Sequence, residues 1–203
     1  KMVGSDPGVL AEINGGTHMS FEDVGIMRNI PTMVIFEPVD GVQLAGMFPH
    51  IINHYGPVYI RLGRKDFAPI FADDQVFELG KAIPIVEGTD VSIFATGIMV
   101  KEALDAQKIL LEQGISASVV NIHTIKPIDA EAILKDVKKT NAVVTAENHN
   151  IINGLGSAVA EVLAATKAKK AFNVLIPDAE VNPPKSFASR FAHLVQAAAF
   201  VWS

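Results

Sequence analysis

The sequence contains no cysteine among its 203 residues. Disulfide bonds, thiolate metal ligands and a cysteine nucleophile are therefore excluded, and the chain suits a reducing compartment, so we expect a cytoplasmic protein. Long apolar runs are also missing, since no stretch approaches the roughly 20 residues that a membrane-spanning helix needs. We therefore expect no membrane partner.

An excess of positive charge is absent too. The net charge is -5 and the calculated pI is near 5.7, which gives no electrostatic reason to expect nucleic-acid binding. What the sequence has instead is apolar residues, 49% of the total, enough for one large or two small cores. The chain opens with KMVGSDPG, without an initiator Met or a signal-peptide core, so we expect a fragment or the ordered part of a longer protein.

Short β-branched runs alternate with helical patterns along most of the chain. TMVIFE (32–37) and VYIRLGR (58–64) are typical of buried strands, and a second series begins at VSIFATG (91–97). This alternation indicates parallel sheets covered by helices. The sequence therefore predicts an α/β fold of two three-layer units with mainly parallel sheets, residues 1–76 and 77–203.

Several local signals refine this prediction. Residues 65–76 lose the periodicity and are expected to link the two units, whereas 77–90 is typical of an edge strand and turn. Asp40 and Asp129 each precede a helical pattern and are expected to cap it. AFNVLIP (171–177) predicts a last strand.

The segment GGTHMSFED contains the first candidate for chemistry, His18. A glycine-rich loop that leads into a helix presents backbone N–H groups, and an imidazole there can exchange protons near neutral pH. Ser20 is expected to cap the helix as part of a capping box. A loop histidine that only satisfies a backbone carbonyl is the commoner case, so both interpretations stay open at this point.

Three further clusters have functional and structural interpretations. Arg61 and Arg64 lie at the end of a strand, where a guanidinium could bind a phosphate, but the pattern alone favours a solvated surface group. His123, in NIHTIKPID, is more typical of a buried structural histidine. In TAENHNIINGLGSAV (145–159) the two glycines of GLG are interpreted as close-packing positions, because no strand directly precedes them as a dinucleotide fingerprint requires.

In this order, the motifs resemble the C-terminal half of transketolases. GGTHMSFEDVGIMRNIP resembles the family's G-P-T-H-Q-x-x-E segment, TMVIFEPVDGVQ its next strand and turn, and YGPVYIRLGR the end of its pyrimidine-binding domain. DVSIFATGIMVKEALDAQKILLEQG and VVTAENHNIINGLGSAVAEVL resemble the C-terminal domain. The resemblance covers residues 1–176 and implies the small subunit of a split bacterial transketolase, in which the N-terminal half is a separate chain.

The resemblance implies transfer of a two-carbon ketol unit between phosphorylated sugars, as in pentose phosphate metabolism, with thiamine diphosphate and Mg²⁺ or Ca²⁺ as cofactors. It implies that His18 lies on the pyrimidine side of the cofactor and helps proton transfer at the substrate, and that Arg64 binds the sugar phosphate. The glutamate that binds the pyrimidine ring and most other cofactor ligands would lie outside this chain. We therefore expect it to be inactive alone and to assemble with an N-terminal subunit, or its missing half, as a homodimer or α2β2 assembly.

Two positions depart from the family pattern. Asn14 stands where the resemblance implies an aspartate that recognises the substrate 2-hydroxyl, and Asp6 stands where it implies a histidine. Asn14 is kept as a substrate-binding candidate, and both departures indicate an unusual ketose donor or aldose acceptor.

Two alternatives remain. The related folds of the β component of 2-oxo acid dehydrogenases and of deoxyxylulose-phosphate synthase would give an enzyme with different chemistry, although THMSFED and Arg64 favour transketolase. The chain could also be a non-catalytic dimerisation domain.

Overall fold

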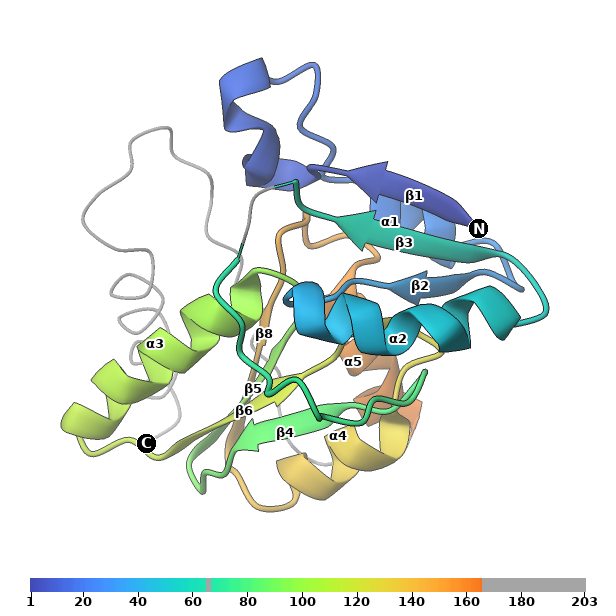
Figure 1. Ribbon diagram of the computed structural model, residues 1–203. Coiled ribbons are helices and arrows are strands. Elements are labelled where there is room, and N and C mark those ends of the chain that lie inside the picture. The colour runs from blue at the N-terminus through green and yellow to red at the C-terminus, as the bar shows by residue number, and fades with distance from the viewer. Residues whose placement is uncertain (65–66, 166–203) are drawn as a thin grey trace.

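The computed structural model describes residues 1–64 and 67–165, which form two four-stranded sheets with helices on their faces (Figure 1). The strand order is β1-β3-β2-β7 in the first sheet and β4-β6-β5-β8 in the second. The strand expected over 171–177 lies outside the described residues. The α/β prediction, with mainly parallel sheets, is confirmed.

The first sheet combines segments that are far apart in the sequence. Its parallel strands β1, β3 and β2 are joined by β7, which runs antiparallel to β2. The strands are β1 (Met2–Ser5), β2 (Val34–Phe36), β3 (Val58–Leu62) and β7 (Thr124–Lys126). One strand of this sheet therefore comes from the range 77–203, while the division of the chain at residue 76 stays a prediction.

The two faces of the first sheet are covered by different helices. On one face Met47 and Ile51 of α2 (Gly41–Asn53) pack with Phe36 of β2. On the other face Val24 of α1 (Asp23–Arg28) packs with Ile35, the neighbour of Phe36. Successive side chains of a strand point to opposite faces, so an uninterrupted apolar run such as β2 is what a sheet buried on both faces requires.

The second sheet is the more regular three-layer unit. Parallel strands β6, β5 and β8 carry an antiparallel edge strand, β4, as expected for 77–90. Helix α3 covers one face, and α4 and α5 cover the other. The elements are β4 (Ile83–Val86), β5 (Val91–Ala95), α3 (Met99–Glu112), β6 (Ala117–Asn121), α4 (Ala130–Val137), β8 (Ala142–Ala146) and α5 (Leu155–Ala165).

The predicted helix caps are confirmed at two places and wrong at one. The Asp40 carboxylate accepts from the backbone N–H of Gln43 at 2.7 Å, and Asp129 accepts from Ala132 at 3.0 Å. Ser20, however, does not cap α1, which begins only at Asp23 and has no side-chain cap. The N-cap position belongs to Glu22 instead, and Ser20 lies in the preceding loop, where its carbonyl accepts from the Gly8 N–H at 2.7 Å.

Within the described part of the chain, no helix has both the length and the apolar character needed to cross a membrane.

Candidate functional site

Asp6 and Arg64 meet where two parallel strands end. β1 ends at Ser5 and β3 at Leu62, and these two residues are register partners. Asp6 follows in the left-handed region, with φ 55°, and its N–H donates to the Leu62 carbonyl at 2.7 Å. Its carboxylate accepts from the backbone N–H of Arg64 at 2.6 Å and from the Arg64 Nε. Ligands of open α/β sheets bind at such carboxyl ends.

Arg64 is the exposed partner of this pair. Its side chain is 65% exposed, whereas that of Asp6 is 8% exposed. The Nη2 of Arg64 also donates to the Asn14 Oδ1 at 3.3 Å. The structure therefore brings together Arg64, a residue that the resemblance implies in substrate binding, and both positions that depart from the family pattern.

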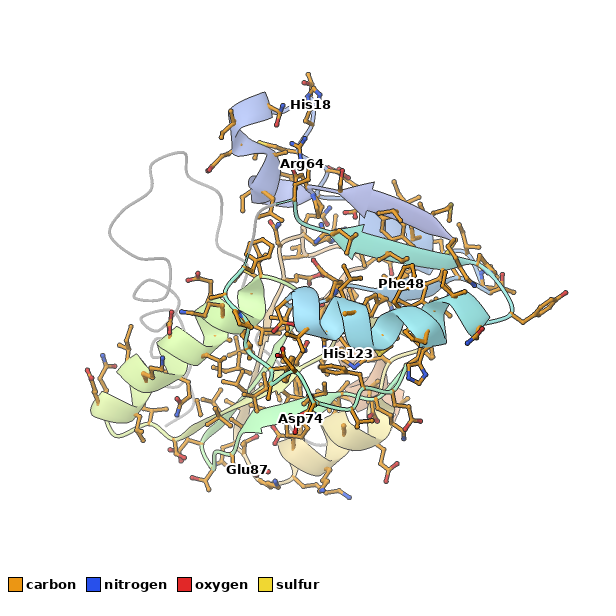
Figure 2. The ribbon with its side chains drawn as sticks, viewed as in Figure 1. His18, Phe48, Arg64, Asp74, Glu87 and His123 are labelled. Carbon is orange, nitrogen blue, oxygen red and sulfur yellow. The ribbon has the colours of Figure 1, made fainter. Side chains whose placement is uncertain are left out.

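His18 lies in the loop that follows a short 3₁₀ helix, η1 (Gly8–Asn14). Its N–H donates to the Gly15 carbonyl at 3.0 Å, its Nδ1 pairs with the Thr17 hydroxyl at 2.9 Å, and the residue is exposed. Figure 2 shows His18 and Arg64 at the same end of the molecule. The imidazole is thus accessible to a substrate, but the structure gives it no hydrogen bond to Arg64 or Asn14.

A polar run after β8 holds both ends of the His18 segment. The Asn148 side chain accepts from the Val9 N–H at 3.0 Å and donates to the Pro7 carbonyl at 2.9 Å. The Asn150 side chain donates to the Phe21 carbonyl at 2.6 Å. The second sheet therefore positions the loop that carries His18, a role that the sequence alone did not indicate for these asparagines.

The two neighbours of Asn148 hold helix ends. Glu147 accepts from the N–H groups of Leu155 and Gly156, at 2.6 and 2.9 Å, at the N-terminus of α5. Burial raises the pKa of Glu147, and the two N–H groups partly oppose that rise. His149 accepts at Nε2 from the Gly25 N–H of α1 at 3.2 Å. These contacts fix the run between α1 and α5.

The prediction of a solvated surface arginine is wrong for Arg61, whose side chain is fully buried at 0% exposure. Arg61 donates to the carboxylate of Asp23 at 2.7 and 3.0 Å, to that of Glu37 at 2.7 Å, and to the Asn148 carbonyl at 2.8 Å. Its partners come from α1, from the end of β2 and from the second sheet. The available signal was its place inside VYIRL, because a strand that is apolar on both faces leaves no exposed side for an arginine.

The charges of this network stabilise one another. Burial alone would lower the pKa of Arg61, but the charges of Glu37 and Asp23 raise it above its ordinary value. Burial alone would raise the pKa of Asp23, but hydrogen bonds from Arg61 and Tyr59, together with the Arg61 charge, hold it below its ordinary value. Arg61 and Asp23 are therefore held in their charged forms.

His123 is buried, as its pattern predicts, between β6 and β7. Its ring packs edge-on against Phe36, with centroids 5.8 Å apart. Burial lowers the pKa of His123 to about 4, although the Lys81 backbone and the charge of Asp129 act in the opposite direction. The residue is a neutral part of the core at physiological pH.

The thiamine diphosphate that the resemblance implies is bound together with a divalent metal ion, which needs protein ligands. No group of three or more His, Asp or Glu side chains in residues 1–64 and 67–165 is arranged to hold a metal ion. Magnesium bound with a phosphate-bearing ligand usually has one or two protein carboxylates as ligands. Three exposed polar side chains, His18, Asn14 and Arg64, lie at this end of the molecule.

Comparison with known proteins gives two family matches that together cover most of the chain. Residues 1–69 match the transketolase pyrimidine-binding domain and residues 80–198 match the transketolase C-terminal domain. The solved structure of a "split gene transketolase, inactive beta4 tetramer" superposes with a TM-score of 0.85 at 36% identity, over 99% of this chain and 66% of that one.

Two of the curated relatives are named as subunits of transketolases. The chain is 61% identical, over 80% of its length, to the 6-deoxy-6-sulfo-D-fructose transketolase subunit SqwH of a Clostridium species. It is 38% identical, over 81% of its length, to an apulose-4-phosphate transketolase subunit of Phocaeicola vulgatus. A 1-deoxy-D-xylulose-5-phosphate synthase of Geobacter sulfurreducens is 37% identical over 78% of the chain, which covers 25% of that protein.

The chain spans about half the length of the two transketolase subunits, 51% and 53% respectively. The two family matches occur in the order that the motifs predict, and they include His18 and Arg64 in the first and the run after β8 in the second. The chain belongs to the transketolase family.

Proposed function

We propose that this chain is the C-terminal part of a thiamine-diphosphate-dependent transketolase, which transfers a two-carbon ketol unit between sugars that carry a terminal anionic group. The observation that carries the proposal is the cluster of Arg64, Asn14 and Asp6 beside the loop of His18, at the carboxyl ends of parallel strands. Membership of the transketolase family supports the reaction class.

The proposal gives the polar groups separate roles. His18 contacts a substrate oxygen and moves a proton there, because an exposed imidazole can both donate and accept near neutral pH. Arg64 binds the anionic end of the sugar through its exposed nitrogens, and Asn14 contacts a sugar hydroxyl. The anionic group is a phosphate or, as the name of the Clostridium relative suggests, a sulfonate.

A second chain is part of the proposal. Thiamine diphosphate with Mg²⁺ or Ca²⁺ would be bound mainly by an N-terminal subunit or half, as the resemblance to transketolases implies. Relatives named as subunits of transketolases support such a partner. The assembly would be a homodimer or α2β2, and the 203-residue chain would be inactive alone.

A related synthase reaction is the second candidate. Its support is the similarity to 1-deoxy-D-xylulose-5-phosphate synthase over most of the chain. Pyruvate decarboxylation by the assembled complex would favour this candidate. A purely non-catalytic role in assembly is less well supported, because Asn148 holds the loop of the candidate histidine at Pro7 and Val9.

The test is coexpression with an N-terminal transketolase subunit, followed by assays of ketol transfer on a panel of phosphorylated and sulfonated sugars. We expect transfer only by the complex, and His18→Ala should lower turnover by about 10² or more if the residue moves a proton. His50→Ala, at an exposed position of α2, is the matched control and should leave turnover unchanged. Ketol transfer by the isolated chain would contradict the need for a partner.

Arg64→Ala tests the anion-binding role in the same assay. The loss of a contact that is made equally in the ground state and the transition state raises KM and changes kcat little. We therefore expect a higher KM for anionic sugars. An unchanged KM for every sugar on the panel would rule out Arg64 as their ligand.

A further inference from the structure

The positive charge of Arg64 is paired with the carboxylate of Asp6. The Asp6 carboxylate accepts both from the Arg64 backbone N–H, at 2.6 Å, and from its Nε. Asp6 is itself held by its backbone, because its N–H donates to the Leu62 carbonyl at 2.7 Å where β1 and β3 end. The negative charge of Asp6 therefore lies directly beside the guanidinium of Arg64.

The contact with Asp6 also decides which edge of the guanidinium is available. Asp6 occupies Nε, and Asn14 Oδ1 accepts from Nη2 at 3.3 Å. A ligand can thus approach only the outer end of a side chain that is 65% exposed, with the 8% exposed Asp6 carboxylate behind it. Paired in this way, Arg64 offers hydrogen-bond donors with little net positive charge.

An anion at this position experiences both attraction and repulsion. A group with one negative charge gains the hydrogen bonds of Arg64 and is repelled weakly by Asp6. A phosphate has its second pKa near 6 and is a dianion in neutral or weakly basic solution. Each additional unit of ligand charge increases the attraction to Arg64 and the repulsion from Asp6 in the same proportion, so a second charge gains little at this nearly neutral pair. The second charge also makes the ligand costlier to remove from water, and a pair with little net positive charge does not offset that cost.

We propose that Asp6 is a specificity-determining residue, which makes the Arg64 site select sugars with a monoanionic end, a sulfonate or a sulfate ester, against sugars with a phosphate dianion. The proposal rests on the proposed function, because it requires that the sugar's anionic end meets Arg64. It assigns a role to a residue that stands where the transketolase resemblance implies a histidine.

Two sugars of nearly equal shape test the charge alone. D-fructose 6-sulfate and D-fructose 6-phosphate share the bridging oxygen and the tetrahedral end, and they differ in charge at pH 8. The assembled complex is used for kcat/KM in ketol transfer and for Kd by titration calorimetry. We expect the wild type to favour the sulfate, and Asp6→Asn to shift both ratios toward the phosphate by on the order of tenfold.

The variant and its control remove the same charge at different places. Asn retains an oxygen that can accept from the Arg64 N–H, so Asp6→Asn preserves the backbone contact. Asp74→Asn removes a carboxylate from an exposed loop that Figure 2 shows far from Arg64, and it should leave the ratios unchanged. An equal shift in both variants would mean that the net charge of the protein, and not the position of Asp6, determines the preference between sulfate and phosphate.

The ratios test the role of Asp6, whereas ketol transfer itself tests the proposed function. Ketol transfer with ratios that Asp6→Asn does not move would overturn the inference and leave the function intact. Binding ratios that shift without any ketol transfer would support the inference and contradict the function. A wild type that prefers the phosphate, or that binds neither sugar, would overturn the inference without any variant, so poor folding of Asp6→Asn cannot hide the answer.

Discussion

Arg61 and Arg64 lie on the same short segment at the end of β3, but Arg61 is buried and Arg64 is exposed to solvent. Arg61 points into the core, where Asp23, Glu37 and the Asn148 carbonyl accept its hydrogen bonds. Arg64 points outward, with a side chain that is 65% exposed. The sequence identified both as strand-end cations. Only the burial of the surrounding residues shows that one is structural and the other is available to a ligand.

Replacing Arg61 by Met tests this division at the residue scale. The change leaves two carboxylates, Asp23 and Glu37, without their buried partner. Removing one partner of a buried ion pair typically costs about 3–5 kcal/mol, so we expect a loss of unfolding free energy of that order in urea titrations. Lys101→Met removes a surface i,i+4 pair with Asp105 and should cost at most about 0.5 kcal/mol. Equal losses in the two variants would contradict the structural role of Arg61.

At the scale of elements, the segment from Pro7 to Phe21 depends on the polar run after β8. Asn148 pairs with Pro7 and Val9 at one end of the segment, and Asn150 pairs with Phe21 at the other. Gly8 is required there, because it has a φ of +56° and an added Cβ would lie 2.2 Å from the Asn148 Oδ1. The position of the His18 loop is therefore decided by residues of the other sheet.

Asn148→Ala should loosen this segment while both sheets remain folded. The change leaves the Val9 N–H and the Pro7 carbonyl without their partner, at a cost of about 1–3 kcal/mol for unsatisfied buried groups. We expect amide hydrogen exchange in residues 8–20 to become roughly tenfold faster or more, because local opening becomes easier.

Asn53→Ala, at the exposed end of α2, is the control and should leave exchange in residues 8–20 unchanged. The idea fails if residues 8–20 exchange at the same rate in Asn148→Ala and in the wild type.

At the scale of the whole molecule, His123 lies where the chain passes from one sheet to the other. It follows β6 of the second sheet and precedes β7 of the first, and its carbonyl accepts from the Glu37 N–H at 2.8 Å. Burial lowers its pKa to about 4 from an ordinary 6.5. Between these values the unfolded chain binds a proton that the folded chain does not bind.

The sign of the resulting pH dependence follows directly. The unfolded state holds more protons between pH 4 and 6.5, so the free energy of unfolding rises with pH across this window. The stability that the neutral His123 contributes is lost as pH falls through the same window. The contribution is at most about 3.5 kcal/mol, from roughly 1.4 kcal/mol for each pKa unit. The pKa of Glu147 is raised by burial, so this residue makes the free energy of unfolding fall as pH rises. The pKa of Asp23 is lowered, so its contribution changes only at pH values below the ordinary pKa of an aspartate.

His123→Gln isolates this contribution, because the other titrating groups remain in both proteins. Urea unfolding measured from pH 4 to 7.5 should show a smaller slope in the variant than in the wild type. His50→Gln changes an exposed histidine and should retain the wild-type slope. A variant curve parallel to that of the wild type would show that His123 is not the group responsible.

Much of the fold was predictable from the sequence for a simple reason. Strand runs such as TMVIFE and VSIFATG, and caps such as Asp40 and Asp129, depend on neighbours in the chain, so local pattern was enough to locate them. The Ser20 cap was predicted wrongly because α1 begins only at Asp23, while Ser20 lies in the preceding loop and is hydrogen-bonded to Gly8, outside the local window.

The amino-acid pattern alone predicted the α/β class, and the resemblance of the motifs to transketolases indicated the family and the candidate residues His18, Arg64 and Asn14. Three features became visible only in the folded chain: Asp6 neutralises Arg64, Arg61 is buried, and Asn148 holds the His18 segment. The physical reason is the separation along the chain of the residues that interact. Helix and strand patterns report interactions between nearby residues, whereas an ion pair or a side-chain to backbone hydrogen bond between distant segments exists only once the sheets have brought those segments together.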